Sequence, residues 1–481
     1  MTIRYRVARS LLVVLLCAPG LACGFAVVFP SRAVAPVGGM ISSPSSRPSS
    51  SSRSVRTNNN DEDEKSGGGS NDGDCSIAGP PNPSSPSFVA NRRSTMELLC
   101  GGMALSSLLL SPSTAHAYAA SDDDAGSGSM KRILITGSNS GIGMDAARRM
   151  AVRGHEVVLA CRTLDKAKAA ADRIRTNVAN DSEDAVDAMA LLKSLKLTPM
   201  ECDLADLSSI DSFVRNLRND GEYAFDAVCY NAGLARNVDA RDVARTRQGY
   251  ELTVGTNHLG HFYLNHLLLG GNRINENGGR IVVTASSVHD PDSPGGSQGA
   301  TATLGDLSGF ERAVADGSGR FDMVDGGWYN ADKAYKDSKL CNIIFARELQ
   351  RRLSADERTR NIIANSFTPG LIVGTGLFRD QNQVFTKVFD VAATKLLKVG
   401  ETTHYGGGAL EYMTLSAKVG ERGGGYYYYS EPGSSKYGDG AFGRQFDVSE
   451  VSKEARACDD DGRAKRFWEL SEELTLNRTR S

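Results

Sequence analysis

The chain has 481 residues and a formal net charge of −2 at pH 7. A balanced charge excludes the strongly basic surface that non-specific nucleic-acid binding needs, so we expect no nucleic-acid partner. Nine cysteines occur, but none pairs as Cys-x-x-Cys or clusters with histidine, so we predict buried free thiols and no metal site.

The first 90 residues have the composition of a targeting leader. Residues 1–25 carry arginines followed by an apolar run that ends in small residues, which is the layout of a secretory signal peptide. Residues 26–90 are rich in Ser, Gly, Asn and Pro, with few apolar side chains. Such a stretch cannot bury enough surface to offset its ordering entropy, so we predict a low-complexity transit region there.

Residues 91–129 form a second signal and a linker. Arg92 and Arg93 precede a short apolar run, and residues 115–117 (Ala-His-Ala) fit a cleavage site. The three parts together resemble the leaders of algae with complex plastids, which implies a plastid protein at the thylakoid membrane or in the lumen. The alternative is that residues 96–117 form a membrane anchor, or an apolar patch within a longer transit peptide.

From Met130 onward the sequence predicts one α/β domain, residues 130–481. A short apolar strand at residues 133–135 runs directly into a glycine-rich turn and then an amphipathic helix. Glycines there permit a tight turn and close approach of the backbone to a pyrophosphate, which the helix N-terminus then faces. The predicted dinucleotide-binding residues of this turn are Gly137, Ser138, Asn139, Ser140, Gly141, Ile142 and Gly143.

The second strand, EVVLACR, ends in Arg162. An acidic residue at this place would hold a free ribose 2′-hydroxyl, whereas the planar guanidinium of an arginine can bind a 2′-phosphate. We therefore predict NADP(H) rather than NAD(H). The alternative is an ordinary surface arginine.

Strands and helices continue to alternate along the chain. A polar insertion at residues 176–198 is expected to be a surface loop or helix, and a third strand follows it. Alternation of this kind predicts a Rossmann-type, doubly wound parallel sheet, with ligands at the carboxyl ends of the strands. The candidate residues at the ends of strands three to six are Asp203 and Leu204, then Asn231, Ala232 and Gly233, then Ser286 or Ser287, then Pro369 and Gly370.

A tyrosine and a lysine four residues apart, Tyr335 and Lys339, share one face of a predicted helix. An ammonium there favours the ionised phenol, which makes the phenol a better acid–base. The order of Thr-Gly-x3-Gly-Ile-Gly, Asn-Ala-Gly, a helix asparagine, a strand-end serine and Tyr-x3-Lys resembles the short-chain dehydrogenase/reductase family.

This resemblance implies four catalytic roles. Tyr335 would donate a proton, Lys339 would lower the pKa of Tyr335 and hold the nicotinamide ribose, and Ser286 would hydrogen-bond the reacting oxygen. Asn257 would keep a water in the proton path. Counting from Arg280 favours Ser286 over Ser287. The nearby His258 and His261 have the simpler interpretation of satisfied helix histidines.

Longer motifs resemble the light-dependent protochlorophyllide reductases from Lys131 to the C-terminus. They include ELTVGTNHLGHFYL, MVDGGWYNADKAYKDSKLCN and GGGYYYYS, and Tyr335 follows Ser286 by 49 positions. The resemblance implies NADPH, an apolar carboxylated tetrapyrrole as substrate, and Thr375 in contact with the nicotinamide. Apolar residues after Gly374 would suit a lid, or equally a core-packing helix.

Two departures from that family concern the substrate. Leu371 stands where the family has a cysteine proposed as proton donor or substrate contact, and Thr368 replaces an aromatic residue. One alternative is therefore a light-independent carbonyl reductase, similar to the retinol-dehydrogenase type, acting on an apolar aldehyde or ketone; Leu371 and His289 favour it. Another is a non-catalytic NADPH-binding assembly protein. Homo-oligomers are common in this superfamily.

Overall fold

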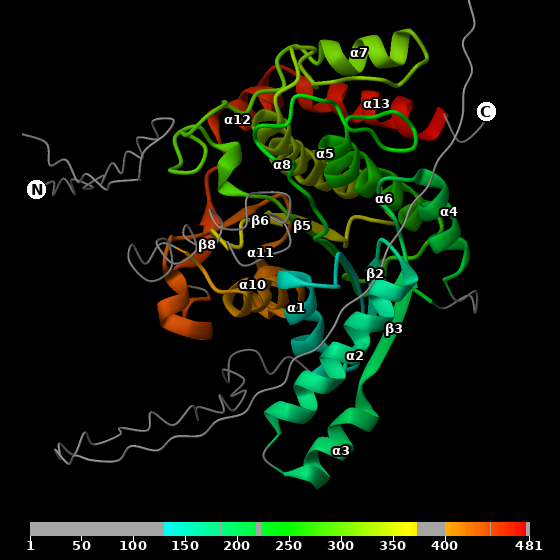
Figure 1. The fold of residues 1–481 in the computed structure, drawn as a ribbon, viewed down its shortest axis with the longest axis vertical. Helices are drawn as coiled ribbons and strands as arrows, with labels where there is room; N and C mark the ends of the chain where they lie inside the picture. Colours follow the sequence, from blue (N-terminus) through cyan, green and yellow to red (C-terminus); the bar gives the residue numbers. More distant parts are fainter. Residues whose placement is uncertain (1–128, 183, 218–222, 373–399, 443, 478–481) are drawn as a thin grey trace, which may run out of the picture. The chain divides into compact units, whose positions relative to one another are not determined.

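The computed structural model describes residues 129–182, 184–217, 223–372, 400–442 and 444–477 (Figure 1). The three predicted leader segments lie outside these residues, so their boundaries stay predictions. Thr375 and the predicted lid also lie outside them.

Within the described residues, eight strands form one sheet in the order β3-β2-β1-β4-β5-β6-β7-β8. Strands β1 to β7 pair in parallel, and β8 runs antiparallel to β7. This confirms the predicted doubly wound fold. The strands are β1 (Arg132–Thr136), β2 (Glu156–Cys161), β3 (Lys196–Glu201), β4 (Ala227–Tyr230), β5 (Arg280–Thr284), β6 (Ile363–Phe367), β7 (Tyr427–Ser430) and β8 (Phe446–Ser449).

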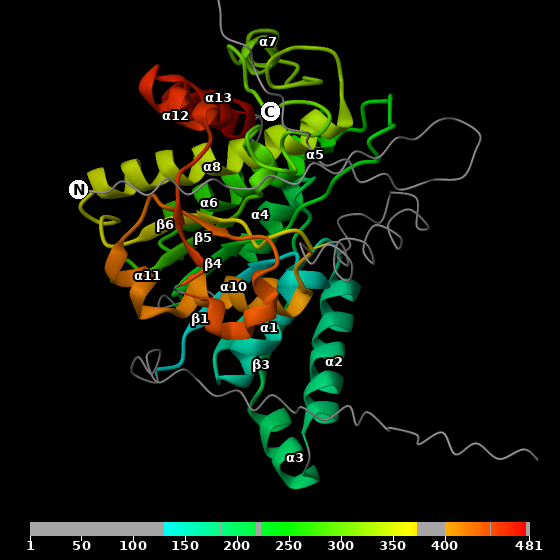
Figure 2. The same cartoon turned by 90° about the vertical axis from the view of Figure 1, so that its left-hand side faces the viewer.

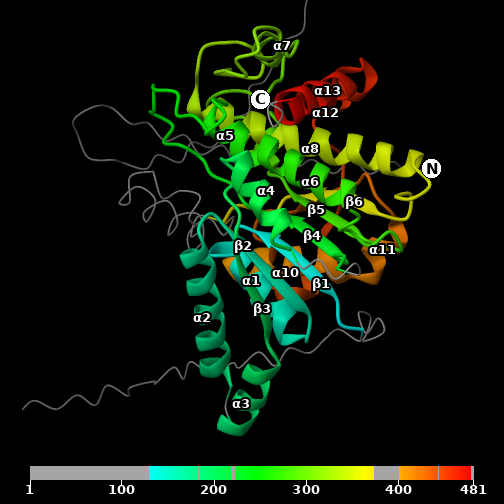
Figure 3. The same ribbon diagram turned by 90° about the vertical axis from the view of Figure 1, so that its right-hand side faces the viewer.

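Helices cover both faces of the sheet, as Figures 2 and 3 show from two sides. One face carries α4 (Leu207–Arg215), α5 (Leu252–Val254), α6 (Gly260–Gly270) and α8 (Ala331–Ala355), with α7 (Ser308–Ala315), α12 (Lys453–Asp460) and α13 (Arg463–Leu476) packed outside them. The other carries α1 (Gly141–Val152), α2 (Leu164–Asp181), α10 (Thr403–Leu415) and α11 (Ala417–Arg422). No helix among the described residues has both the length and the hydropathy that a membrane span requires.

The polar insertion at residues 176–198, predicted as a surface loop or helix, is mostly helical, because α2 continues to Asp181 and α3 (Ala185–Ser194) follows it. The predicted end of the third strand was wrong. Strand β3 begins at Lys196 and ends at Glu201, before the predicted end at Asp203 and Leu204. It is an edge strand with partly exposed side chains, which is why it tolerates Pro199 and lacks a clear apolar pattern.

A second correction concerns the end of the sheet, where an all-parallel arrangement was predicted. The run after Gly425 is β7, and the chain then returns through a 3₁₀ helix (Ser434–Ala441) to the antiparallel β8. Antiparallel neighbours need no helix crossing the sheet, so this short connection suffices. The carboxyl end of β7 therefore joins those of β1 to β6 along one edge.

Ion pairs hold α1 and α8 in place. These two helices flank the carboxyl ends of the strands, where ligands are expected to bind. Arg149 on α1 is 1% exposed and donates to Asp145 at 2.9 Å and to Glu411 of α10 at 3.0 Å. On α8, the Lys333 ammonium lies 3.0 Å from Asp325 and donates to the Thr303 carbonyl at 2.8 Å. The long segment between β5 and α8 is thus tied to the helix that carries Tyr335.

Candidate active site

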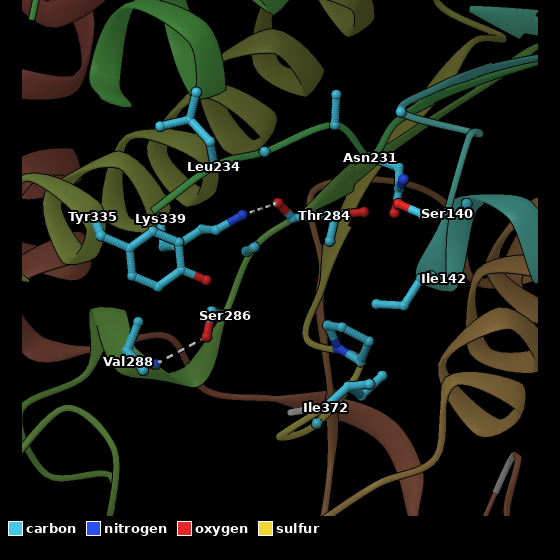
Figure 4. A pocket seen from close by; sticks show the side chains of 18 of the residues that line it. Ser140, Ile142, Asn231, Leu234, Thr284, Ser286, Val288, Tyr335, Lys339 and Ile372 are labelled. Carbon is cyan, nitrogen blue, oxygen red and sulfur yellow. Dashed lines mark hydrogen bonds between the residues drawn. The ribbon is translucent and has the colours of Figure 1, made fainter. Parts of the chain in front are cut away.

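A cavity of about 400 Å³ lies at the carboxyl ends of the parallel strands (Figure 4). The structure brings most of the predicted site residues into its wall. Those residues are Gly137, Asn139, Ser140, Gly141, Ile142, Gly143, Arg162, Asp203, Leu204, Asn231, Ala232, Gly233, Ser286, Tyr335, Lys339, Pro369 and Gly370. Ser138 and Asn257 lie behind the wall.

The glycine turn between β1 and α1 fits a pyrophosphate. Gly137 has φ +68°, and a Cβ there would lie 2.7 Å from Ala232 Cα. A Cβ on Gly143 would lie 2.5 Å from Asn231 Nδ2. The N-cap residue of α1, Ser140, accepts no hydrogen bond through its side chain, so the first N–H groups of the helix remain for an anion.

Thr136, at the end of β1, ties this turn to the Asn-Ala-Gly loop. Its hydroxyl oxygen accepts hydrogen bonds from the backbone N–H of Asn231 at 2.9 Å and of Ala232 at 3.0 Å. His261 Nδ1 donates to the Asn257 carbonyl at 3.0 Å, which leaves Nε2 to accept from the Thr136 hydroxyl at 2.9 Å. The histidine is therefore held neutral as part of the scaffold.

We expect His258 and His261 to make the fold sensitive to acid. Burial lowers the pKa of His258 to about 3 and of His261 to about 4, so the unfolded chain binds these protons first as the pH falls. The free energy of unfolding therefore falls below pH 6.5. At pH 5 it is lower than at pH 7 by about 2 kcal/mol for each histidine. Urea unfolding at both pH values measures the loss.

The variant His261→Gln should reduce that pH dependence, whereas substitution of the exposed His266 should leave it unchanged. An unaltered slope in His261→Gln would contradict the assignment.

Two cations occupy the end of the cavity beyond β2. Arg162 directly follows the strand, and Lys166 lies in the first turn of α2, which Thr163 caps. Neither side chain pairs with a carboxylate among the described residues, so both remain for a phosphate oxygen. Two cations at this place agree with the predicted preference for NADP(H). Lys166 was not predicted, although it stands four residues after Arg162 in the sequence.

The other end of the cavity holds Ser286, Tyr335 and Lys339 (Figure 4). The Ser286 side chain lies close enough to Tyr335 to lower the pKa of its phenol, and it accepts from the Val288 N–H at 3.4 Å. The Lys339 ammonium lies 5.6 Å from the centre of the Tyr335 ring and donates to the Thr284 carbonyl at 3.3 Å. The proximity of Ser286 to the phenol favours Ser286 over Ser287, which also lines the cavity.

Comparison with known proteins identifies the family. Residues 131–304 match the family model described as short chain dehydrogenase. The chain is 31% identical over 344 residues to protochlorophyllide reductase A, chloroplastic, of Arabidopsis thaliana, covering 71% of this chain and 76% of that protein. It is 33% identical over 349 residues to the protochlorophyllide reductase of Avena sativa, covering 71% and 98%. The chain belongs to the short-chain dehydrogenase/reductase family.

Solved structures give weaker likenesses. A putative uncharacterized protein from Mycobacterium paratuberculosis is 26% identical with a TM-score of 0.47, over 72% of this chain and 93% of that one. L-sorbose reductase of Gluconobacter frateurii, complexed with NADPH and L-sorbose, is 20% identical with a TM-score of 0.43, over 63% and 96%. Membership of the short-chain dehydrogenase/reductase family rests on the sequence relatives, and it confirms the predicted enzyme class, an NADP-dependent oxidoreductase.

Burial shifts the pKa values of both Tyr335 and Lys339. It raises the pKa of the Tyr335 phenol, against a smaller lowering by the hydrogen bond with Ser286. It lowers the pKa of Lys339 to about 8. Burial dominates the pKa of Tyr335 in this structure, and the lowering of that pKa by Lys339 stays a prediction.

Three side chains that were considered from the sequence lie behind the cavity wall. Asn257, within a π-helical turn (Gly255–Leu259), accepts from the Leu234 N–H at 2.9 Å and donates to the Leu234 carbonyl and to Ser338, each at 3.0 Å. Ser138 is buried against Cys161. His289 is 1% exposed and donates to the Ser286 carbonyl at 2.7 Å, so it supports the serine rather than lining the cavity.

The cysteines of the described domain are all free and buried, as predicted. Leu371 lines the cavity with 38% of its surface exposed, and Thr368 instead hydrogen-bonds the Tyr427 hydroxyl at 2.7 Å. The other residues of the cavity wall at this end were not predicted. They include Val288, Pro294, Ile372, Tyr429, Ser430 and Pro432.

Proposed function

We propose that the chain reduces a ring double bond of a protochlorophyllide-like tetrapyrrole in a plastid, with NADPH. The observation that carries this proposal is the match to protochlorophyllide reductases over most of the catalytic domain. An apolar wall formed by Leu371, Ile372 and Val288 beside Tyr335 supports it, because a flat apolar ring needs such a surface.

The proposed roles follow from the positions of the side chains. NADPH, when bound, would supply the hydride. Tyr335 would donate the proton that follows, while Ser286 orients the phenol through their hydrogen bond. Lys339 is 4% exposed, and its ammonium would hold the ribose hydroxyls and stabilise the phenolate that remains. Asn257 would position the loop at Leu234.

Mixing the full chain with NADPH and protochlorophyllide, in darkness and then under illumination, tests this proposal. We expect an absorbance change to the reduced pigment only in the light, because the bound pigment is the absorber in enzymes of this type. A control without NADPH should show no change. No pigment turnover in either condition would refute the proposed function.

Leu371 favours a second candidate, a light-independent reductase of an apolar aldehyde or ketone. A leucine cannot donate a proton, so Tyr335 would be left as the proton donor of the Ser286–Tyr335–Lys339 group, which is the set that carbonyl reduction needs. Oxidation of NADPH by retinal in darkness, abolished in Tyr335→Phe, would separate this candidate from the first.

The chloroplastic names of the relatives support the predicted plastid location. A site at the thylakoid membrane or in the lumen, and a homo-oligomeric state, remain proposals. Fractionation of plastids and size measurement of the purified chain would test them.

A further inference from the structure

A phenol at the substrate end of the cavity has no role in the chemistry described above. Tyr429 lies in β7 and lines the same cavity as Ser286 and Tyr335. Tyr428 pairs with Phe367 of β6 and its carbonyl accepts from the Thr368 N–H at 2.8 Å, so Tyr429 comes level with Thr368, directly before Pro369. Tyr429 therefore lies at the strand end next to the one that leads to Leu371.

Among the tyrosines of β7, Tyr429 is the one that lines the cavity. Side chains alternate along a strand, so Tyr427 and Tyr429 share a face, and their rings lie 6.5 Å apart. The Tyr427 hydroxyl is bonded to Thr368. Among the described residues nothing hydrogen-bonds the Tyr429 hydroxyl, although its ring is partly buried. A tyrosine in such a place normally finds a partner for its O–H.

The charges around Tyr429 select the kind of partner. Burial, and after it the carboxylates of Glu431, Asp290 and Glu401, raise the pKa of the Tyr429 phenol to about 12, so the hydroxyl keeps its proton and donates. Their negative potential disfavours a carboxylate at this spot. The basic residues of the described cavity wall are Arg162 and Lys166, at its far end, and Lys339, which lies beside Tyr335 and donates to the Thr284 carbonyl. A neutral oxygen is the acceptor that fits.

We propose that Tyr429 is a specificity-determining residue that donates a hydrogen bond to a neutral carbonyl oxygen of the substrate, remote from the bond being reduced. It replaces, from the neighbouring strand, the polar contact that Leu371 does not offer. This inference rests on the proposed function, because it places the substrate between Tyr335 and Tyr429. A tetrapyrrole with a ring ketone has the required oxygen, and its free carboxylate would point away from Glu431 and Asp290.

The test compares Tyr429→Phe with the parent chain, using the full protein, NADPH and protochlorophyllide under illumination. We expect the KM for the pigment to rise about 10-fold, with kcat within about 2-fold and the Kd for NADPH unchanged, because one neutral hydrogen bond is lost. Tyr426→Phe is the matched control, since Tyr426 belongs to the same tyrosine run but is exposed outside the cavity.

A second arm uses a pigment whose ring ketone has been reduced to a methylene group. That analogue should bind about 10-fold more weakly than protochlorophyllide to the parent chain and equally well to Tyr429→Phe. A general structural effect of the substitution would not abolish the difference between the two pigments.

The outcomes separate this inference from the proposed function. An unchanged KM in Tyr429→Phe, or discrimination between the pigments that survives it, overturns the inference while the proposed function stands. A rise in the Kd for NADPH together with a lower melting temperature would also overturn it, by showing a structural role. A parent chain that neither binds nor converts protochlorophyllide removes the proposed function, and this inference with it.

Discussion

Replacing Tyr335 by phenylalanine is expected to lower kcat by about 10²- to 10⁴-fold, the usual contribution of a positioned general acid. The phenol lies in the cavity wall near Ser286 and beside the Lys339 ammonium. Phenylalanine keeps the ring and removes the hydroxyl that would donate the proton. Single-turnover oxidation of NADPH, followed by absorbance, measures the loss.

The binding of NADPH should survive this substitution. The glycine turn and Arg162 are built on other elements, and Lys339 keeps its bond to the Thr284 carbonyl. The Kd for NADPH is therefore expected to stay within about 3-fold of the parent value, which corresponds to less than 1 kcal/mol. The exposed Tyr437 offers a matched control, and Tyr437→Phe should be fully active.

A Tyr335→Phe variant with parental kcat would contradict the assignment of the proton donor. A loss of similar size in Tyr437→Phe would show that the assay responds to tyrosine content and not to the site.

Ser286→Ala provides an internal comparison, because it removes the partner of the phenol and leaves the phenol itself. A smaller loss than in Tyr335→Phe is expected, since the orienting bond and the proton are different contributions.

The cofactor half of the site could be predicted from sequence because its signals are local. A buried strand, glycines at fixed offsets and a helix start occupy a dozen consecutive residues around Gly137 and Gly141. Arg162 follows from the next strand. The rule that ligands bind at the carboxyl ends of parallel strands then brings distant segments together without any knowledge of their contacts.

The substrate half could not be predicted, because it depends on contacts between distant segments. The tyrosine run from Tyr426 to Tyr429 has no apolar–polar alternation that would mark which rings face the cavity. Only the register against β6 shows that Tyr428 points to the opposite face and Tyr429 toward the site. The antiparallel return of β8 was missed for the same reason.

Three roles depend on contacts that the spacing of residues in the sequence does not reveal. Ser286 and Ser287 are adjacent in sequence, and the proximity of Ser286 to the Tyr335 phenol distinguishes them. A π-helical turn directs the Asn257 amide to the Leu234 backbone, and its expected place in the proton path stays a prediction. His289 was taken to favour a carbonyl reductase, and in the structure it donates to the Ser286 carbonyl from behind the cavity wall.

The second large effect is expected at the 2′-phosphate end of the cofactor site. Arg162→Ala and Lys166→Ala should each raise the Kd for NADPH by about 10- to 100-fold, because a hydrogen bond to a charged group contributes about 1.5–3 kcal/mol. The affinity for NADH should change little, since NADH lacks the phosphate that these cations would bind. Fluorescence titration of both nucleotides measures the two Kd values.

Lys168→Ala is the matched control, because Lys168 lies on the same helix α2 but outside the cavity and exposed to solvent. Its effect on the Kd for NADPH should be small and should vanish in moderate salt, since it acts only through the screened field. Direct contacts behave differently: the losses in Arg162→Ala and Lys166→Ala should persist in salt. Two results would contradict this assignment: an equal rise in the Kd for NADPH in all three variants, or a rise in the Kd for NADH as large as that for NADPH. Either would show that the cations do not contact the 2′-phosphate, and that the preference for NADPH comes from another part of the cavity.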